Sequence, residues 1–332
     1  IVLDLGNPIQ VSISQFYGIE INDFAVTVAK TALWIAESQM MKETEDIVHT
    51  SLDFLPLKSY ANIIEGNALQ LDWESVIPKY KLNYIMGNPP FIGYSLQSKE
   101  QKEDILSIYI DEKGKPYKTA GKIDYVSGWY FKAAQFINGT NIRTAFVSTN
   151  SITQGEQVAG VWKPLYDRFG IHIDFAHRTF RWDSEASMKA HVHCVIVGFS
   201  SAPNYAARII YSSDRAQAAE NINAYLIDAP TVFIESRNTP LCEVPQMVYG
   251  NKPTDGGFLF LSPEEYQGVI SAEPAIGKYI KRIYGATEYI NNKVRYCLWL
   301  VGASPAEIRN SRFIMERVEA VRNFRLNSTK EA

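Results

Sequence analysis

Short apolar runs that end at once in a polar turn are the feature that most constrains the fold of this 332-residue chain. Three of them lie within the first 91 residues, and their turns read GIEIN, EGNAL and GNPPF. A long stretch of helical periodicity follows the first run, with Asn22 and Asp23 as a helix N-cap. Strand-like and helix-like stretches go on alternating after these turns. Such alternation predicts a mostly parallel, doubly wound α/β sheet.

The alternation predicts the elements of this sheet up to about residue 200. The expected strands cover residues 15–21, 61–64, 82–86, 144–148, 171–176 and 191–199, and the expected helices cover residues 24–41, 124–137 and 158–169. After that the chain becomes richer in Pro, Gly and Asn. We therefore expect a domain of residues 1–200, followed by a smaller α+β domain of residues 201–332. Near the end of the chain, the segment SPAE has the residues of a capped helix start, which predicts one helix over residues 305–324.

Composition predicts a folded protein without a membrane span or a metal site. Hydrophobic residues make up 46% of the chain and charged residues 21%, as in ordinary globular proteins. No run approaches the about twenty apolar residues that cross a bilayer, so we expect a cytoplasmic protein with no membrane partner. Three cysteines, Cys194, Cys242 and Cys297, are too widely spaced for a disulfide framework or a zinc ribbon. We expect reduced thiols, and we interpret His191 and His193 as structural because no further metal ligand is spaced near them.

Charge is distributed very unevenly along the chain. The segment from residue 278 to the end carries eleven Lys and Arg against five Glu, a net charge of +6, whereas the rest of the chain carries −9. A basic segment attached to an acidic body is typical of a protein in which one part contacts phosphates and the other binds small molecules. A solvated helical surface would explain the same charges. The residues that we expect to contact the phosphates of DNA are the arginines of the final helix together with Lys278, Lys281, Arg282, Lys293 and Arg295.

Polar side chains follow the first two predicted strands at the point where each strand ends. Ligands of open parallel sheets bind outside the carboxyl ends of the strands. Glu20, at the end of the first strand, can accept hydrogen bonds from both hydroxyls of a ribose, although an acidic residue is also favoured at a helix start. Asn67, in the next turn, can read an adenine edge through its amide, although it also suits a plain turn. The two side chains are therefore candidates for binding a nucleoside.

The turn after the third predicted strand, Asn88-Pro89-Pro90-Phe91, is the most specific motif in the chain. Its two consecutive prolines stiffen the backbone and remove two donors, so the turn presents carbonyl acceptors in fixed directions. The Asn88 side-chain oxygen and the Pro89 carbonyl can hold the hydrogens of an exocyclic amine, so that its nitrogen attacks a methyl sulfonium without a strong base. Phe91 offers a flat apolar face to a base that has been flipped out of a duplex. A rigid turn with a core Phe is the alternative interpretation.

In this order, GIEIN, EGNAL and GNPPF resemble the ribose, adenine and catalytic motifs of the amino-methyltransferases. The stretches FYGIEINDFAVTVAKTALWIAE, GNPPFIGYSLQSKEQKEDI, FVSTNSITQGEQV and HRTFRWDSEASMKAHVHCVIVGF are similar to bacterial type IIL, MmeI-like DNA methylases. The likeness is strong over about residues 15–200, and the remainder resembles the start of a target-recognition region. It implies a class I (Rossmann-like) methyltransferase sheet that uses S-adenosylmethionine to methylate N6 of adenine in duplex DNA, within a restriction–modification system.

The resemblance also implies a role for each candidate residue. The residues that would hold the target base are Asn88, Pro89, Pro90 and Phe91. Those that would bind the cofactor are Glu20, Ile21, Asn67, Ala68 and Asn88, with Glu20 at its ribose and Asn67 at its adenine. Many relatives have Asp in place of Asn67. The residues that lie where the family flanks the flipped base are Phe180 and Trp182, and methyl transfer in the family needs no metal.

One feature of the family is missing from its expected place. A glycine-rich turn after the first strand passes under the methionine of the cofactor, and no GxG turn precedes Glu20. The segment IVLDLG at the start of the chain is superficially like that strand, but Asn7 and Pro8 follow it instead of glycines. We therefore expect the chain to lack the first strand and the glycine loop, and to form an incomplete cofactor pocket within a longer protein. A nuclease domain further upstream would fit such a protein.

Other functions fit part of the pattern. Without its glycine loop, the chain can be an inactive DNA-recognition fragment of a larger restriction–modification protein. NPPY and NPPF turns also serve methyltransferases that act on protein glutamine or on N2 of RNA guanine, although the long region after residue 200 suits site-specific duplex DNA better. A nicotinamide-dependent dehydrogenase shares the sheet and the acidic strand end but leaves the NPPF turn unexplained.

Overall fold

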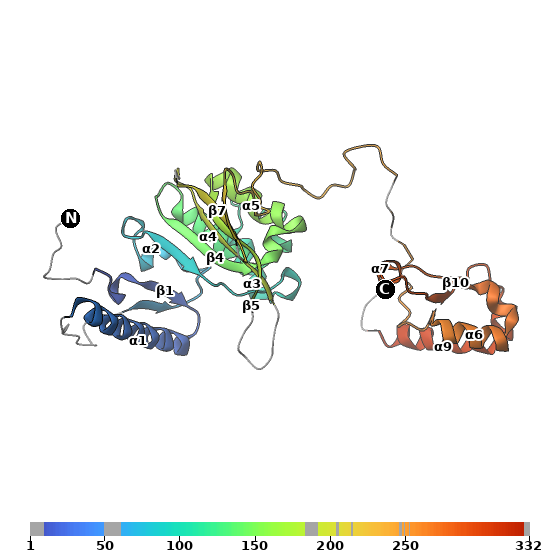
Figure 1. Cartoon of the computed structure of the whole chain (residues 1–332). Helices are drawn as coiled ribbons and strands as arrows, with labels where there is room; N and C mark the ends of the chain where they lie inside the picture. Colours follow the sequence, from blue (N-terminus) through green and yellow to red (C-terminus); the bar gives the residue numbers. More distant parts are fainter. Residues whose placement is uncertain are drawn as a thin grey trace. The chain divides into compact units, whose positions relative to one another are not determined.

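The computed structural model describes residues 10–49, 61–182, 192–203, 206–213, 215–245, 248, 250–251 and 253–328. The chain divides into two compact units, Ile1–Thr239 and Pro240–Ala332, and each has a core of its own. Figure 1 shows the elements of both units along the chain. None of the described helices is long and apolar enough to cross a membrane.

The first unit contains a small sheet and a large one. In the small sheet, β1 (Tyr17–Glu20) pairs in parallel with β2 (Asn62–Glu65). The large sheet has six strands in the order β3-β4-β6-β5-β7-β8. These strands are β3 (Tyr84–Gly87), β4 (Arg143–Thr149), β5 (His172–Trp182), β6 (Val192–Ser200), β7 (Arg208–Ser212) and β8 (Arg215–Ala219).

The large sheet is mixed, whereas the alternation of strands and helices predicted a mostly parallel one. β3 is parallel to β4 and β5 is parallel to β7, but β6 runs antiparallel to both β4 and β5. Only residues 183–191 separate β5 from β6. Neighbouring strands joined by so few residues pair antiparallel, because a parallel crossover takes about a dozen residues or more. The predicted α/β class is confirmed, with this antiparallel strand as the correction.

Strand pairing is interrupted between the two sheets. In the described part of the chain, β1 pairs only with β2, and the outer edge of β3 pairs with no strand. The side chains of Tyr84 and Met86 on β3 are exposed. The segment IVLDLG, which we interpreted as a false match to a first strand, lies outside the described residues, and so does His191.

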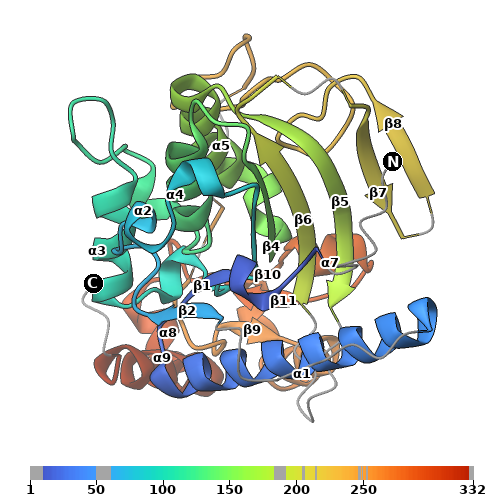
Figure 2. The same cartoon turned by 90° about the vertical axis from the view of Figure 1, so that its left-hand side faces the viewer.

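Helices pack on both sheets of the first unit. α1 (Asp23–Val48) packs on β1 and β2, and Asn22 caps it by accepting a hydrogen bond from the Ala25 amide, which confirms the predicted cap. The short α2 follows β2. Figure 2 shows α3, α4 and α5 together beside the large sheet. These helices are α2 (Trp73–Val76), α3 (Lys99–Ile108), α4 (Ser127–Ile137) and α5 (Gly155–Phe169).

The core of the first unit lies between these helices and the large sheet. Tyr130 of α4, Trp162 of α5 and Phe199 of β6 are fully buried, and the rings of Tyr130 and Phe199 stack with centroids 5.5 Å apart. The hydroxyls of Tyr130 and Ser148 share a hydrogen bond of 2.5 Å. The polar atom of this buried ring therefore has the partner that burial requires.

The first unit continues beyond residue 200, where the sequence placed the domain boundary. β7 and β8 follow that residue and extend the large sheet, with β7 parallel to β5. The ring of Phe233 packs on Tyr166 of α5 with centroids 5.5 Å apart. The chain as far as Thr239 therefore belongs to the first unit.

The second unit is a small α+β domain, as predicted. Its three-stranded antiparallel sheet has the order β10-β11-β9. Its core contains Leu261, Tyr279, Leu298 and Ile314, all of them buried. The elements of this unit are β9 (Phe260–Leu261), α6 (Pro263–Ala272), β10 (Ile280–Arg282), α7 (Ala286–Ile290), β11 (Tyr296–Leu298), α8 (Pro305–Asn310) and α9 (Arg312–Leu326).

The prediction of a single helix over residues 305–324 is wrong, because two helices occupy this segment. The helix start is as predicted, with Ser304 and Glu307 forming a capping box at α8. The break comes at the buried Ser311, whose hydroxyl donates to Glu273 at 2.5 Å and accepts from the Ile314 amide at 3.1 Å. A serine hydroxyl that binds nearby backbone favours a cap over a helix interior, so α9 starts afresh at this residue.

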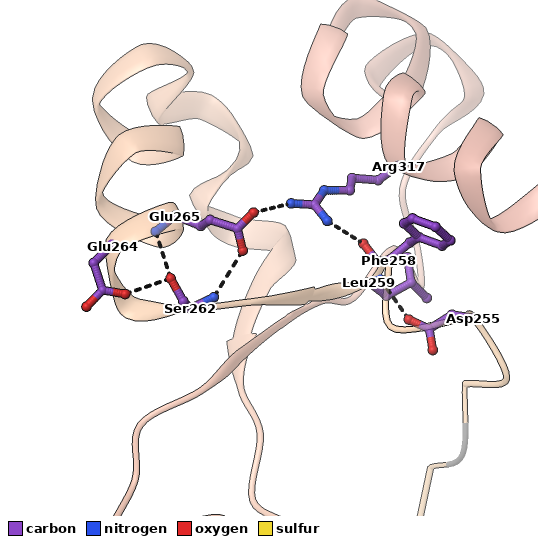
Figure 3. A network of polar contacts seen from close by, with 7 residues as sticks. All are labelled: Asp255, Phe258, Leu259, Ser262, Glu264, Glu265 and Arg317. Carbon is purple, nitrogen blue, oxygen red and sulfur yellow. Dashed lines mark hydrogen bonds and ion pairs between the residues drawn. The ribbon is translucent and has the colours of Figure 1, made fainter.

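A polar network joins α9 to the start of α6 (Figure 3). Ser262 caps α6, and one carboxylate oxygen of Glu265 accepts from the Ser262 amide at 3.2 Å. The other oxygen pairs with the guanidinium of Arg317 on α9 at 2.5 Å, and Arg317 also donates to the Phe258 carbonyl at 3.2 Å. The two helices and the chain before β9 are thus held by one arginine.

Candidate functional site

The turns that follow β1 and β2 lie side by side. The Gly66 amide donates to the Glu20 carbonyl at 2.8 Å, and Glu20 is the register partner of Glu65. The Glu20 side chain is half-buried, and one of its oxygens accepts from the Ile21 amide at 2.9 Å. Its second oxygen has no hydrogen-bond partner among the described residues, and Ile21 is exposed. The two predicted nucleoside-binding turns therefore form one continuous edge.

The Asn67 amide is held by two hydrogen bonds. Its Nδ2 donates to Oδ2 of Asp104 at 2.9 Å, and its Oδ1 accepts from the Leu69 amide at 2.9 Å. Ala68 is half-buried, and its carbonyl accepts from the Trp73 indole N–H at 2.8 Å. The amide that we expected to read adenine is therefore fixed in orientation rather than free to rotate.

Asp104 of α3 accepts hydrogen bonds from three side chains beneath this turn. Its side chain is buried, with 4% of the residue exposed. Besides Asn67, Gln70 Nε2 donates to Oδ1 at 2.8 Å and the Tyr125 hydroxyl donates to Oδ2 at 2.7 Å. Burial and the hydrogen bond to Asp104 raise the pKa of the Tyr125 hydroxyl well above its usual value. Asp104 thus joins the EGNAL turn to α3 and to the segment before α4.

The Asn88-Pro89-Pro90-Phe91 turn directly follows β3, where the sequence placed it. Asn88 is exposed, and its side chain has no hydrogen-bond partner in the described part of the chain. Pro89 is buried, Pro90 is exposed and Phe91 is half-buried. The turn is therefore anchored at one proline, while the amide before it stays available to a ligand.

The chain just after this turn is fastened by two neighbouring residues. The Tyr125 amide donates to the Ile92 carbonyl at 2.9 Å, and the Tyr94 amide donates to Oδ1 of Asp124 at 3.0 Å. The other Asp124 oxygen accepts from the Ser151 hydroxyl, which follows β4, at 2.5 Å. Because the Tyr125 hydroxyl also reaches the network under the EGNAL turn, one residue connects the NPPF turn with the predicted adenine-binding turn.

A lysine from α4 supports the EGNAL turn from another side. Lys132 Nζ donates to the carbonyl of Leu69 at 2.6 Å and to the carbonyl of Leu71. Burial lowers the pKa of Lys132 to about 8, against the attraction of Asp72 and Asp104, which acts to raise it. The ammonium therefore serves as a structural donor for a turn that lies outside regular secondary structure.

Phe180 and Trp182 lie at the end of β5, on the same edge of the large sheet as the NPPF turn. Thr149 of β4 pairs with Cys194 of β6, which pairs with Phe180, so the carboxyl ends of β4 and β5 are level. β3 and β5 are three strand positions apart, which is about 14 Å at the usual spacing.

The Phe180 and Trp182 rings have centroids 6.1 Å apart, and Trp182 is 45% exposed. A register shift between His177 and Phe180 marks a bulge, which changes the direction of side chains at a strand end.

Sequence reasoning did not identify the residues that hold these turns in place. Asp104 lies in the charged stretch KEQKEDI, which is typical of a solvated helix face. The one available signal was its neighbour Ile105, because an apolar residue in a polar stretch indicates the buried side of α3. The positioning residues missed in this way are Asp104, Asp124, Tyr125, Lys132 and Ser151.

The predicted phosphate contacts of the second unit fall into two groups. Lys278 forms an ion pair with Glu307, and Arg295 pairs with Glu288 at 3.1 Å. Three of the other named lysines and arginines have no ion pair among the described residues, so their charges are available to a partner. These residues are Lys281, Arg282 and Lys293.

The arginines of α9 also bind partners within the chain, whereas Arg309 of α8 has no ion pair among the described residues. Arg312 pairs with Glu316 at 2.8 Å, and Arg325 donates to backbone carbonyls before β9 at 3.0 and 3.2 Å. Arg317 is the residue that joins α9 to α6, and Arg322 lies 3.6 Å from Glu319. Much of the positive charge near the end of the chain is therefore neutralised locally.

A cavity of about 840 Å³ lies in the second unit beside the unpaired cations. Lys281, Arg282, Tyr284 and Trp299 are among the residues that line it. The residues that line this cavity all belong to the second unit. No group of three or more metal-ligating side chains occurs in the described ranges.

Comparison with known proteins defines the class as a DNA-methyltransferase domain followed by a target recognition domain. The model of the MmeI DNA-methyltransferase domain matches residues 2–212, and the model of the MmeI target recognition domain matches residues 228–332. The chain belongs to the MmeI family. The resemblance that we drew from the strand-end motifs is confirmed.

Two similar proteins are informative. The chain is 40% identical over 322 residues to DNA methyltransferase A of Bacillus subtilis (strain 168), and the match covers 96% of this chain and 36% of that protein. The structure of the type IIL restriction-modification enzyme MmeI in complex with DNA matches with a TM-score of 0.85 and 44% identity, over 99% of this chain and 44% of that one. The chain thus spans less than half the length of either protein.

Proposed function

We propose that this chain carries the part of a restriction–modification enzyme that transfers a methyl group from S-adenosylmethionine to N6 of adenine in duplex DNA. The Asn88 amide carries the proposal, because it is exposed at the end of β3, is followed by two prolines and has no partner among the described residues. Family membership and the MmeI structure in complex with DNA support it. We place the reaction in the cytoplasm, with a nuclease domain elsewhere in the same longer polypeptide.

The chemistry needs acceptors rather than a strong base. S-adenosylmethionine supplies a methyl group on a positively charged sulfur. The Asn88 side-chain oxygen and the Pro89 carbonyl accept the two N–H bonds of the target amine, so the nitrogen lone pair is directed away from the turn. Transfer would leave the neutral thioether S-adenosylhomocysteine as the leaving group, and the proton lost by the methylated nitrogen would pass to solvent water. Asn88 is thus the residue whose loss removes turnover while other contacts remain.

Groups at the ends of β1 and β2 fit the nucleoside of the cofactor. Glu20 keeps one carboxylate oxygen without a partner among the described residues, as binding of ribose hydroxyls requires. The Ala68 amide likewise has no partner in the described part of the chain, and it lies next to the fixed amide of Asn67. Exposed Ile21 offers an apolar surface beside them. These residues would hold the nucleoside without any metal.

Aromatic residues on the same sheet edge fit a flipped base. Phe91 directly follows the two prolines, so it is only a few residues from Asn88 and Pro89, whose oxygens would hold the amine. Stacking of a base on an aromatic side chain contributes about 1–3 kcal/mol. Phe180 and Trp182 lie about 14 Å away along the sheet edge, so we assign them to flanking the extruded nucleotide or its neighbours.

The second unit would bind duplex DNA through Lys281, Arg282 and Lys293, which have no ion pair among the described residues. Lys281 and Arg282 are on β10 beside the cavity, and Lys293 lies before β11. Lys278 and Arg295, which we first grouped with them, each have a carboxylate partner. We therefore assign the phosphate contacts mainly to the unpaired group.

The test is the variant Asn88→Ala, with Asn138→Ala as the matched control because Asn138 is an exposed residue at the end of α4. We expect Asn88→Ala to lower methyl transfer to duplex DNA about a hundredfold or more, the usual cost of removing one positioned polar group from an active site. The dissociation constant of the cofactor should change less than about threefold, because this amide holds the target amine.

The product decides the remaining alternatives. Mass spectrometry of nucleosides from methylated DNA is expected to show N6-methyladenine. Near-normal turnover by Asn88→Ala would reject the catalytic assignment. A product methylated on RNA guanine N2 or protein glutamine would reject the DNA substrate, and absence of any cofactor binding would favour an inactive recognition fragment.

A further inference from the structure

We propose that Asp104 is a positioning residue that turns the oxygen of the Asn67 amide, rather than its nitrogen, towards the exocyclic amine of the cofactor's adenine. The inference rests on the proposed function and adds the reason that an asparagine can serve at this position. Asn67 has an oxygen and a nitrogen that fit the same space, so an unsupported amide presents either atom. Selectivity for adenine then needs a second residue that decides between them.

The hydrogen bonds on the Asn67 amide permit only one orientation. A carboxylate can only accept, so the nitrogen must face Asp104, where Nδ2 lies 2.9 Å from Oδ2. A backbone N–H can only donate, so the oxygen must face the Leu69 amide, 2.9 Å from Oδ1. Turning the amide over would place oxygen against oxygen and N–H against N–H. Two buried polar contacts would be lost at once.

Asp104 is itself held so that it cannot follow a rotating amide. Gln70 Nε2 occupies Oδ1 at 2.8 Å, and the Tyr125 hydroxyl shares Oδ2 with Asn67 at 2.7 Å. The residue is 4% exposed and lies on α3, whose start is fixed by a capping box of Ser98 and Gln101. The orientation of Asn67 is therefore set from outside the turn.

In this orientation the Asn67 oxygen keeps a second lone pair, which can accept a hydrogen bond from the adenine of the cofactor. The oxygen accepts one hydrogen bond from Leu69, and a carbonyl oxygen can accept two. Asn67 is half-buried, so part of its surface remains accessible. An acceptor at this point favours a base with an exocyclic amine and disfavours one with a carbonyl there. Asp104 thus makes Asn67 present the same atom that an aspartate would present.

The test compares S-adenosylhomocysteine with S-inosylhomocysteine by calorimetric titration, because in the second probe a carbonyl replaces the exocyclic amine and the adjacent ring nitrogen N1 carries a hydrogen. We expect the wild type to prefer the adenine probe about tenfold or more, the effect of leaving one polar group unpaired. Asp104→Leu should reduce this preference at least about fivefold, because only the Leu69 amide then opposes a turn of the Asn67 amide that presents its nitrogen. Glu103→Leu is the matched control, since Glu103 is the exposed carboxylate next to Asp104 on α3 and lies 3.9 Å from Lys99, and it should leave the preference within about twofold.

A double-mutant cycle separates positioning from a general structural role. Asn67→Asp alone places two carboxylates together and should weaken binding of both probes about tenfold or more. Asp104→Asn alone should be nearly neutral, because an amide oxygen can still face Asn67. The double variant restores a donor–acceptor pair, so it should recover most of the affinity and of the preference for adenine.

Each outcome bears on a different claim. Failure of Asp104→Asn to rescue Asn67→Asp overturns the positioning role, and so does an equal loss for both probes in Asp104→Leu with a native circular dichroism spectrum. Absence of adenine-probe binding by the wild type overturns the proposed cofactor site and this inference with it. Rescue together with the loss of preference in Asp104→Leu supports the inference.

Discussion

Lys132 is a half-buried lysine whose ammonium donates to the carbonyl of Leu69, in the EGNAL turn, and to that of Leu71, just after it. An aliphatic residue could fill the same space on α4 but could not donate to those carbonyls. Burial disfavours the charged form of the lysine at this position and lowers its pKa to about 8. This lowered pKa makes the free energy of unfolding depend on pH.

We expect the free energy of unfolding to rise between about pH 8 and pH 10 by a contribution that the variant Lys132→Met lacks. The pKa of Lys132 is about 8 in the folded chain, against the usual value of 10.5. Between these two values the unfolded state binds a proton that the folded state has released. Stability therefore increases with pH in this window and loses the contribution below about pH 8. Thermal unfolding of both proteins across this range measures the difference.

Lys163→Met is the matched control for this prediction. Lys163 is exposed on α5 and pairs with Asp167 at 2.5 Å, and this hydrogen bond raises the pKa of Lys163. Its substitution should leave the pH dependence between about pH 8 and pH 10 unchanged, since the group stays charged in both states. Parallel pH profiles for the wild type and Lys132→Met would contradict the prediction.

The candidate site residues that the sequence identified are those whose predicted role depends on near neighbours. The NPPF turn follows from four consecutive residues, and the Asn22 cap follows from the helical stretch directly after it. Asp104 meets Asn67 across 37 positions of the chain, and apart from the neighbouring Ile105 nothing in KEQKEDI distinguishes it from the exposed Glu103. Contacts at such separations depend on how α3 packs, which a single sequence does not encode locally.

At the scale of elements, the break between α8 and α9 depends on one buried serine. We expect Ser311→Ala to destabilise the second unit by about 1–2 kcal/mol, because α9 loses its cap and Glu273 loses a donor. Hydrogen exchange measured by mass spectrometry over residues 305–326 should show faster exchange. Ser271→Ala is the control, since the hydroxyl of Ser271 only bonds back to its own helix. Unchanged protection in Ser311→Ala would mean that packing alone sets the break.

Elements of the first unit were easier to predict than their pairing. The strands that became β1 to β4 and the helices α4 and α5 all lie where periodicity and turns placed them. β6 lies between β5, which a short connection joins to it, and β4, which is much earlier in the chain, so alternation alone wrongly favoured a mostly parallel sheet. β7 and β8 were missed because the sequence after residue 200 no longer alternates with helices.

At the scale of the whole molecule, the net charge of +6 after residue 277 overstates the charge that is free to meet DNA. We expect Lys281→Ala, Arg282→Ala and Lys293→Ala each to reduce the slope of log affinity against log salt by about 0.9, the effect of one lost phosphate contact. Affinity should fall equally on target and random duplexes. Fluorescence anisotropy at several salt concentrations measures both quantities.

Lys278→Ala serves as the comparison for these variants. Its ammonium already pairs with Glu307, so its removal should change the salt slope clearly less. A slope that is unchanged in all the variants would identify the basic segment as a solvated surface. A change of preference at one base pair, with the slope intact, would instead assign the altered residue to reading the DNA sequence.

The hydrogen bonds beneath the EGNAL turn also bear on the entropy of ligand binding. The side chains of Asn67, Gln70 and Tyr125 are ordered by Asp104, and the turn is tied to β1 through the Gly66 amide. Each rotamer-rich side chain that becomes immobile on association costs about 0.5–1.5 kcal/mol. Here that loss of freedom already occurs during folding. Affinity at this turn therefore reports the contacts of the ligand itself, with little subtracted for ordering the protein.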